Sequence, residues 1–351
     1  MSTRKCLVLG VFFFKFSHSL VFGLGPSIPS DSAIRWKSLW PYAPLKYEPV
    51  IGINLGWQSH YYGSDLSKNF DPDWWNERFA LLSNTPYRVV RIWLFESGEG
   101  IEHYKIQPTM QKNINTLLDL AETHRLYIYF TALNGNTSKG RDFYAEQYNI
   151  LHDKYNAQDR FIEGTLLPLA KQISEHPHTF ALDLINEAEA SRFKGTASSI
   201  SQIRNFVRKS ISHIKALTPT LRITASAGWH IGILDQSLGL YQGLGLDFYD
   251  VHVYNLTGKI WLCEAARNRA REEGLPILLG EFGPLAKRLG KKHRARVYTD
   301  FVQNAIDCGY SGVLPWKLED PYNPQHSLLK EGTLQWNGPG SSLLDLLKAA
   351  S

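Results

Sequence analysis

The chain has 351 residues, of which 43% are hydrophobic and 20% are charged. This length suits one large barrel or two ordinary domains. The net charge is only +5, and lysines and arginines are scattered apart from a dense run at residues 287–296. We expect that run to coat a solvated helix, so the charge pattern argues against a nucleic-acid-binding protein.

The three cysteines, Cys6, Cys263 and Cys308, do not have the spacing of metal ligands. This argues against a zinc site and against a disulfide scaffold. Cys6 lies in the N-terminal leader, and the other two fall in predicted helices late in the chain. Those helices can bring Cys263 and Cys308 together, but we expect both to be buried free thiols.

The N-terminus resembles a secretory signal. Arg4 and Lys5 precede an apolar stretch, and small residues follow where cleavage is expected. Lys15 interrupts the apolar run, so the alternative is an uncleaved anchor. We expect residues 1–23 to form this signal peptide or anchor, and residues 24–49 to form a proline-rich lead-in. The protein is then secreted or periplasmic if the leader functions, and cytoplasmic or membrane-associated otherwise.

From residue 50 onward, short apolar runs alternate with helical patterns. We predict strands at residues 50–55, 88–94, 126–132, 180–185, 222–227, 248–253, 276–280 and 312–316. We predict helices at residues 73–83, 109–124, 159–175, 198–217, 258–273, 292–307 and 342–350. The connection at residues 234–245 is too rich in glycine to predict a helix.

Strict alternation of strand and helix implies a parallel sheet, and eight units in about 300 residues imply closure. We therefore predict one α/β domain over residues 50–351, a single (β/α)8 TIM barrel. The alternative is an open doubly wound sheet. Such a sheet would favour a glycine-rich phosphate loop after the first strand, and residues 52–60 lack both its spacing and a following helix start.

Two glutamates, Glu187 and Glu281, directly follow apolar strands. In a (β/α)8 barrel this position is the C-terminal mouth, where such barrels carry their chemistry. The two side chains are therefore expected to converge on one pocket. Retaining glycosidases need such a pair, with roughly 5 to 5.5 Å between an acid that protonates the leaving oxygen and a nucleophile that attacks the anomeric carbon.

The order of these motifs resembles that of the clan A retaining glycosidases, most closely glycoside hydrolase family 5, the cellulase and mannanase family. Asn186 and Glu187 end the fourth predicted strand, and Gly-Glu-Phe-Gly at residues 280–283 ends the seventh. The resemblance covers residues 50–350. It implies that Glu187 is the general acid/base, with a raised pKa, and that Glu281 is the nucleophile, which stays ionised. It implies no metal and no other cofactor.

The same resemblance gives roles to supporting residues. Arg91 supplies a compensating positive charge to the nucleophile, and Asn186 binds the sugar 2-hydroxyl, although a turn-forming Asn is the plainer interpretation. A strand histidine is usually a core residue, but with both glutamates in register we favour a functional role for His252. His252 and Tyr254 orient the nucleophile, and Trp316 forms an aromatic floor under the sugar.

Other positions are less specific, and the chain departs from the family at two places. Trp57 and Trp229 are cleft walls or simple packing residues. Ala188 follows Asn-Glu where the family usually has proline. The third-strand loop lacks the usual histidine, and either Asn134 or Asn136 takes its place as a hydroxyl partner. These departures leave the identity of the sugar open.

We therefore predict a retaining hydrolase of β-linked glycans of glucose or mannose, acting by double displacement. The alternatives are a transglycosylase on the same scaffold and a catalytically inactive glycan-binding barrel. The expected partner is an oligo- or polysaccharide, with no nucleic acid and no stable protein partner, and the protein is expected to be a monomer. A metal-dependent hydrolase is less favoured, because its nearest candidate ligands, His176 and His178, precede the fourth strand and lie at the wrong face.

Overall fold

In the computed structural model, all described residues belong to the unit that runs from Ile34 to Ser351. The described residues are 49–58, 66–95, 100–135, 144–190, 199–228, 231–234, 240–285, 289–320 and 326–350. The predicted leader, nearly all of the predicted lead-in, Asn136 and Trp229 lie outside them. Within the described residues, no helix combines the length and the apolar character that a membrane span needs.

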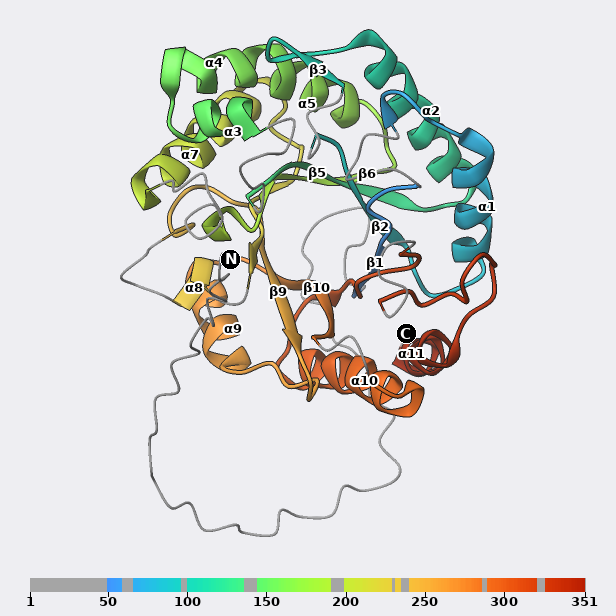
Figure 1. Ribbon diagram of the computed structural model, residues 1–351. Coiled ribbons are helices and arrows are strands. Elements are labelled where there is room, and N and C mark those ends of the chain that lie inside the picture. The colour runs from blue at the N-terminus through green and yellow to red at the C-terminus, as the bar shows by residue number, and fades with distance from the viewer. Residues whose placement is uncertain are drawn as a thin grey trace, which may run out of the picture. The chain divides into compact units, whose positions relative to one another are not determined.

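Parallel strands form the centre of this unit (Figure 1). In chain order they are β1 (Val50–Asn54), β2 (Val89–Trp93), β5 (Tyr127–Asn134), β6 (Thr179–Asn186), β7 (Ile223–Thr224), β8 (Ala227–Gly228), β9 (Tyr249–Asn255), β10 (Ile277–Pro284) and β11 (Gly312–Val313). Their order in the sheet is β7-β6-β5-β2-β1-β11-β10-β9-β8. Every pairing among them is parallel.

The strands at the two ends of this order, β7 and β8, are the two halves of one interrupted strand. Only Ala225 and Ser226 separate β7 from β8, yet β7 pairs with β6 and β8 pairs with β9. The sheet therefore closes on itself, which confirms the predicted (β/α)8 barrel and excludes the open doubly wound sheet. The fifth predicted strand is interrupted because the Ser226 amide donates to the Asp183 side chain (3.0 Å).

Helices surround the strands (Figure 1). They are α1 (Pro72–Ser83), α2 (Pro108–Thr123), α3 (Tyr144–Leu151), α4 (Ala157–Phe161), α5 (Leu167–Ser174), α7 (Ile200–Leu217), α8 (Ile231–Leu234), α9 (Cys263–Glu272), α10 (Lys291–Asp307) and α11 (Gly338–Ala350). Shorter turns are η2 (Lys154–Asn156), η3 (Ile162–Leu166) and η4 (Ala188–Ala190), and a small hairpin joins β3 (Ile101–Glu102) to β4 (Lys105–Ile106). The sequence does not predict α3 or the hairpin.

Local side chains set several of these boundaries. Asp71 accepts from the amides of Asp73 and Trp74 and so begins α1. The predicted helix at residues 258–273 begins only at Cys263. The Asn255 side chain accepts from two amides ahead of it, at Thr257 and Gly258, and holds that stretch in a turn.

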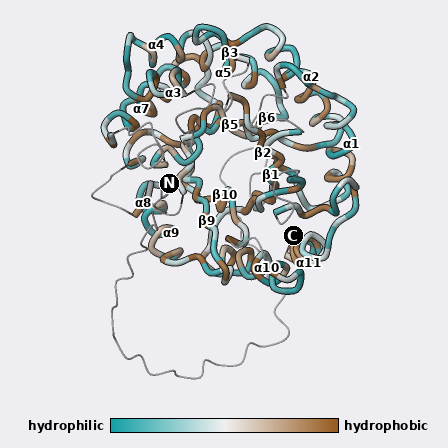
Figure 2. Tube along the Cα trace, in the orientation of Figure 1, coloured by the Kyte–Doolittle hydropathy of each residue, from teal (hydrophilic) through white to brown (hydrophobic). Residues whose placement is uncertain are grey.

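The barrel interior is apolar at one end and polar at the other. One buried cluster consists of Val50, Val89, Tyr129, Phe180, Ala181, Phe248, Leu278 and Leu314. Because side chains on a strand alternate in direction, Arg91 and Asp183 share the face of Val89 and Ala181 and stand above this cluster. A larger cluster fills the space between strands and helices, and the outer helix surfaces are hydrophilic (Figure 2).

Cys263 and Cys308 form a disulfide in the structure, with their Cα atoms 5.9 Å apart. The prediction of two free thiols is therefore wrong. The bridge joins the first residue of α9 to the residue after α10. Nothing in the local sequence around either cysteine reveals this, because the pairing depends on how the two helices pack.

Replacing both Cys263 and Cys308 by serine should lower the free energy of unfolding by about 2 to 4 kcal/mol, because the bridge restricts the unfolded chain. Thermal unfolding with and without a reductant measures this effect. Reductant should lower the melting temperature of the wild type and leave the double variant unchanged. A wild type with both thiols free to react and no response to reductant would contradict the bridge.

Candidate active site

The predicted catalytic and binding side chains come from the carboxyl ends of several strands. Register places Arg91 beside Asn54, and Asn134 beside Asn186. Glu281 on β10 lies beside His252 on β9. Parallel strands present their carboxyl ends at one edge, so the closed barrel brings these residues to one mouth.

Glu281 lies in a distorted part of β10. The register of β10 against β9 shifts between Leu279 and Glu281. A Cβ on Gly280 would lie 1.7 Å from Oδ1 of Asp250, so only glycine fits there. Such a bulge re-aims the next side chain, and here it turns Glu281 toward the barrel mouth.

Glu187 lies just beyond β6 and has a left-handed backbone, with φ of 47°. Its amide donates to the carbonyl oxygen of Ser226 (3.0 Å). Left-handed backbone is uncommon for a residue with a side chain and is found repeatedly at active sites. The chain turns sharply here and enters η4, which leaves the Glu187 carboxyl pointing across the mouth.

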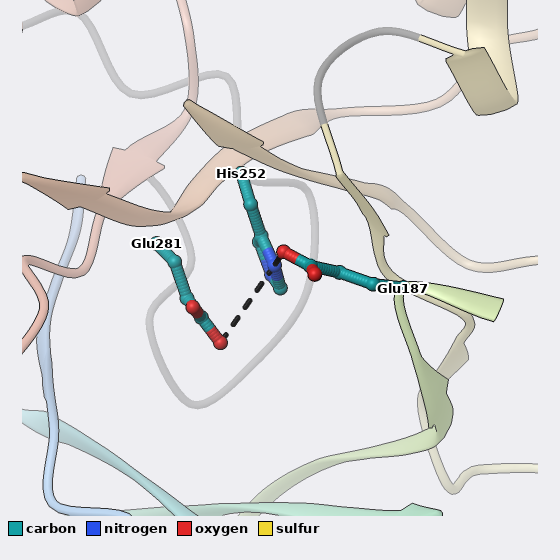
Figure 3. Close-up of side chains that lie close together, drawn as sticks. All are labelled: Glu187, His252 and Glu281. Carbon is teal, nitrogen blue, oxygen red and sulfur yellow. Dashed lines mark hydrogen bonds and ion pairs between the residues drawn. The ribbon is translucent and has the colours of Figure 1, made fainter. Parts of the chain in front are cut away.

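Glu187, His252 and Glu281 point toward one another (Figure 3). The His252 Nδ1 atom lies 2.9 Å from Oε1 of Glu187 and 3.7 Å from Oε1 of Glu281. One polar atom from each of the three side chains lies within 4.8 Å of the others. The structure therefore brings together the two predicted catalytic carboxyls, with the predicted histidine between them.

Arg91 is buried and contacts the nucleophile candidate directly. Its Nη1 atom donates to Oε1 of Glu281. Its Nη2 atom donates to Oδ2 of Asp183 at 2.8 Å and to Oδ1 of Asn186 at 2.9 Å. Burial lowers the pKa of Arg91, but the carboxylates of Glu281 and Asp183 outweigh this and raise it above its ordinary value. Arg91 is therefore a permanent cation in the barrel.

Asp183 is a site residue that the sequence analysis missed. Besides Arg91 it accepts from the Ser226 hydroxyl at 2.7 Å, and it is buried. A signal was present, because Asp183 stands inside the apolar run of β6 and a buried charge needs a partner. Asn54 was missed as well, and its Oδ1 atom accepts from Arg91 at 3.2 Å.

Tyr254 is a second hydrogen-bond donor to Glu281. Its hydroxyl donates to Oε2 of Glu281 at 2.7 Å. Burial, followed by the charge of Glu281, raises the pKa of Tyr254 well above its ordinary value, so the phenol keeps its proton. Each oxygen of Glu281 therefore accepts from one donor, Arg91 or Tyr254.

His252 is held positive by its neighbours. Burial lowers its pKa, but the charge of Glu281 and the hydrogen bond with Glu187 outweigh this and raise the pKa to about 9. On its other side, Nε2 lies 3.6 Å from Oδ1 of Asp250. Burial raises the pKa of Asp250 to about 6 against the opposing charge of His252, and its Oδ2 accepts from the Tyr129 hydroxyl at 2.6 Å.

Asn134 supports Asn186. The Asn186 amide donates to Oδ1 of Asn134 at 3.0 Å, and both side chains are buried. Asn134 therefore lies in the network that ends at Arg91. This contact orients Asn186, whose Oδ1 atom faces the arginine.

The aromatic residues form a packed cluster beside this network. The rings of Trp57, Trp93 and Trp316 lie with centroids 5.6 to 5.8 Å apart. The ammonium group of Lys317 lies 3.5 Å from the centre of the Trp57 ring, a cation–π contact. Trp57 is 5% exposed and packs against both Trp93 and Trp316.

The metal alternative finds little support in the described residues. His176 and His178 lie just before β6, as expected, and the His178 ring stacks on Tyr127. The closeness of Glu187, His252 and Glu281 would suit one cation by distance alone. Arg91 and His252 already contact these carboxyls, Arg91 at Glu281 and His252 at Glu187.

Comparison of the sequence with protein-family models and with curated proteins gives no match. Solved structures do match. The β-mannanase from the blue mussel Mytilus edulis is 19% identical, with 80% of this chain and 91% of that one covered and a TM-score of 0.63. The β-1,4-D-mannanase from Cryptopygus antarcticus is 16% identical, with 86% and 89% covered and a TM-score of 0.67.

A third match is GH5_18 from Streptomyces cattleya, solved with GlcNAc. It is 17% identical, with 86% of this chain and 80% of that one covered and a TM-score of 0.72. These likenesses confirm the predicted barrel and, at the level of the fold, the predicted resemblance to glycoside hydrolase family 5. The chain therefore has the fold of these glycoside hydrolases.

Replacing Arg91 by methionine should lower the free energy of unfolding by about 3 to 5 kcal/mol, because Glu281 and Asp183 would remain buried without their cation. Chemical denaturation measures this. The control is Arg208→Met on the exposed side of α7, which should change stability by no more than about 0.5 kcal/mol. Equal effects of the two substitutions would show that Arg91 does not compensate the carboxylates.

The His252 ring should titrate with a midpoint near pH 9, because its carboxylate neighbours favour the charged form. Imidazole signals followed by NMR across pH 5 to 10, assigned with a His252→Gln variant, measure this midpoint. The charge stabilises the folded state below the ordinary histidine pKa of about 6.5, and this contribution is lost as the pH rises through 9. A midpoint at or below 6.5 would contradict the assignment.

Proposed function

We propose that this protein is a retaining glycoside hydrolase that cleaves β-glycosidic bonds in a β-linked glycan of the glucan or mannan type. The observation that carries the proposal is the spacing of the two carboxyls. Side-chain oxygens of Glu187 and Glu281 come within 4.8 Å of each other. Retaining enzymes hold their two carboxyl groups roughly 5 to 5.5 Å apart, and inverting enzymes hold them roughly 6.5 to 9.5 Å apart.

The partners of the two carboxyls support different roles for them. Glu281 accepts hydrogen bonds from Arg91 and Tyr254 on its two oxygens, which suits an ionised nucleophile of fixed direction. The Glu187 side chain is 22% exposed and contacts His252. A partly exposed carboxyl that reaches a leaving oxygen suits a general acid/base.

In the first step, a carboxylate oxygen of Glu281 bonds to the anomeric carbon while the glycosidic C–O bond breaks. Glu187 gives its proton to the leaving oxygen. In the second step, Glu187 takes a proton from water as the water oxygen attacks the anomeric carbon and Glu281 leaves. Two displacements at one carbon retain its configuration.

Charge in the site changes consistently with these steps. Glu281 loses its negative charge as the covalent bond forms, and Glu187 gains one as it gives up its proton. The positive His252 ring, 2.9 Å from Glu187, stabilises that new carboxylate. Arg91 remains beside Glu281 and stabilises it again as the leaving group of the second step.

The names of the solved relatives favour a mannan-type substrate. Several are described as β-mannanases, and one is described as an exo-β-1,4-mannosidase. The sequence resemblance to the cellulase and mannanase family agrees with this. We therefore place β-1,4-mannans and their oligosaccharides first among the substrates to test, and β-glucans second.

The Cys263–Cys308 disulfide supports secretion. Disulfides persist in oxidising compartments and are rare in the cytosol. Together with the signal-like N-terminus, the bridge favours an extracellular or periplasmic enzyme acting on glycans outside the cytoplasm.

The test is hydrolysis of β-mannans, β-glucans and aryl β-glycosides by the wild type and two variants. Glu187→Ala should reduce turnover by about 10²- to 10⁴-fold through loss of acid catalysis, and Glu281→Ala should reduce it at least as much. Azide should rescue Glu187→Ala with a β-glycosyl azide product, and Glu281→Ala with an α-glycosyl azide. Glu175→Ala is the control, because this exposed residue precedes β6 at the opposite end of the strand.

Wild-type activity that survives both substitutions would overturn the site assignment. Transfer of the glycosyl group to an added sugar in preference to water would identify a transglycosylase. Binding of oligosaccharides without turnover of any of them would identify a glycan-binding barrel.

A further inference from the structure

A third carboxyl group lies beside the two proposed catalytic ones. Glu189 stands in η4, two residues after Glu187, and only 6% of it is exposed. Neither of its oxygens makes a hydrogen bond of standard geometry in the part of the chain that the structure describes. Most buried polar side chains do have a partner, and those without one often have a functional role. The sequence does not predict a role for Glu189.

Glu187 and Glu189 share one space, which Gly228 of β8 leaves open. A Cβ on Gly228 would lie 2.8 Å from Oε1 of Glu189 and 3.4 Å from Cδ of Glu187. Both carboxyl groups therefore pack against the same backbone position. Two acids this close must influence each other's ionisation.

The titratable groups that face Glu189 from the described elements are Glu187, His252 and Tyr241. Burial, and then the charge of Glu187, raise the pKa of Glu189 to about 8, against weaker opposing effects of backbone amides and His252. Burial also raises the pKa of Tyr241 well above its ordinary value, so this phenol stays neutral. Near neutral pH, the pair of Glu187 and Glu189 therefore retains a proton.

We propose that Glu189 is a positioning residue for acid catalysis, paired with Glu187 across Gly228 so that the two carboxyls share one proton and keep it to a higher pH than Glu187 would alone. This inference rests on the proposed role of Glu187 as the general acid.

The charges around the pair produce this effect. The hydrogen bond with His252 favours the first negative charge on Glu187. Once one carboxyl of the pair is ionised, its charge makes ionisation of the other less favourable. The pair therefore keeps its remaining proton to a higher pH, and Glu187 carries that proton in part of the molecules. A permanently neutral side chain at position 189 has no such effect.

The first test is the pH dependence of kcat/KM on a glycan that the wild type hydrolyses. Glu189→Gln keeps the size of the side chain and cannot ionise. For this variant, the pH at which kcat/KM falls on the alkaline side of the profile, its alkaline limb, should be lower by about one unit. This is the coupling expected of two adjacent acids. The control Glu175→Gln removes an exposed carboxyl that lies between α5 and β6 and should leave the alkaline limb in place. A Glu189→Gln profile that drops uniformly at all pH values would show a purely structural role.

The second test needs no substrate. A buried acid whose pKa is raised from 4.5 to about 8 binds its proton more tightly in the folded state. The folded protein therefore loses stability as the pH rises from about 5 to 8. The melting temperature of Glu189→Gln minus that of the wild type should increase over this range, and the difference for Glu175→Gln should stay constant.

A constant difference for Glu189→Gln would overturn the coupling whether or not the protein hydrolyses glycans. If the difference increases but no glycan is hydrolysed, the proposed function fails while Glu189 remains a buried acid with a raised pKa. A second variant, Gly228→Ala, should displace both carboxyls and move the alkaline limb in the same direction as Glu189→Gln. A Gly228→Ala limb that stays at the wild-type pH would contradict the shared space.

Discussion

The organisation of this site depends on one buried cation. Arg91 stands inside the barrel and contacts Glu281 and Asp183 at once, and all three side chains are almost entirely removed from solvent. Burying two carboxylates without a cation would force at least one of them to take up a proton. A protonated Glu281 would not act as a nucleophile. The proposed chemistry therefore requires a guanidinium at this position of β2.

The barrel makes such a buried charge possible by separating its interior into two layers. The apolar cluster under Arg91 excludes water from the lower end, and the strand ends above it supply many polar partners. Glu281 accepts from fixed donors on both oxygens, whereas Glu187 lies beyond its strand on a left-handed residue and reaches the mouth. This difference in surroundings lets two residues of one type take opposite roles.

The sequence predicts the barrel, Glu187, Glu281 and Arg91, because a closed parallel sheet necessarily brings strand ends to one edge. It does not predict contacts that depend on packing between distant segments. The Cys263–Cys308 bridge is one of these, since it depends on the arrangement of two helices. Glu189 is another, because its burial depends on a turn after β6 and on a glycine of a different strand. Strand ends are local features of the sequence, and such pairings are not.

The central claim is that Glu281 forms a covalent bond to the sugar. Incubation with 2-deoxy-2-fluoro-β-mannosyl and β-glucosyl fluorides, followed by mass spectrometry of proteolytic peptides, tests it most directly. The account predicts slow inactivation and one added fluorosugar on Glu281, with no label in Glu281→Ala. A fluorosugar attached to another residue of a catalytically active protein would contradict the claim. So would an active protein that takes up no label and inverts the anomeric centre of its substrate.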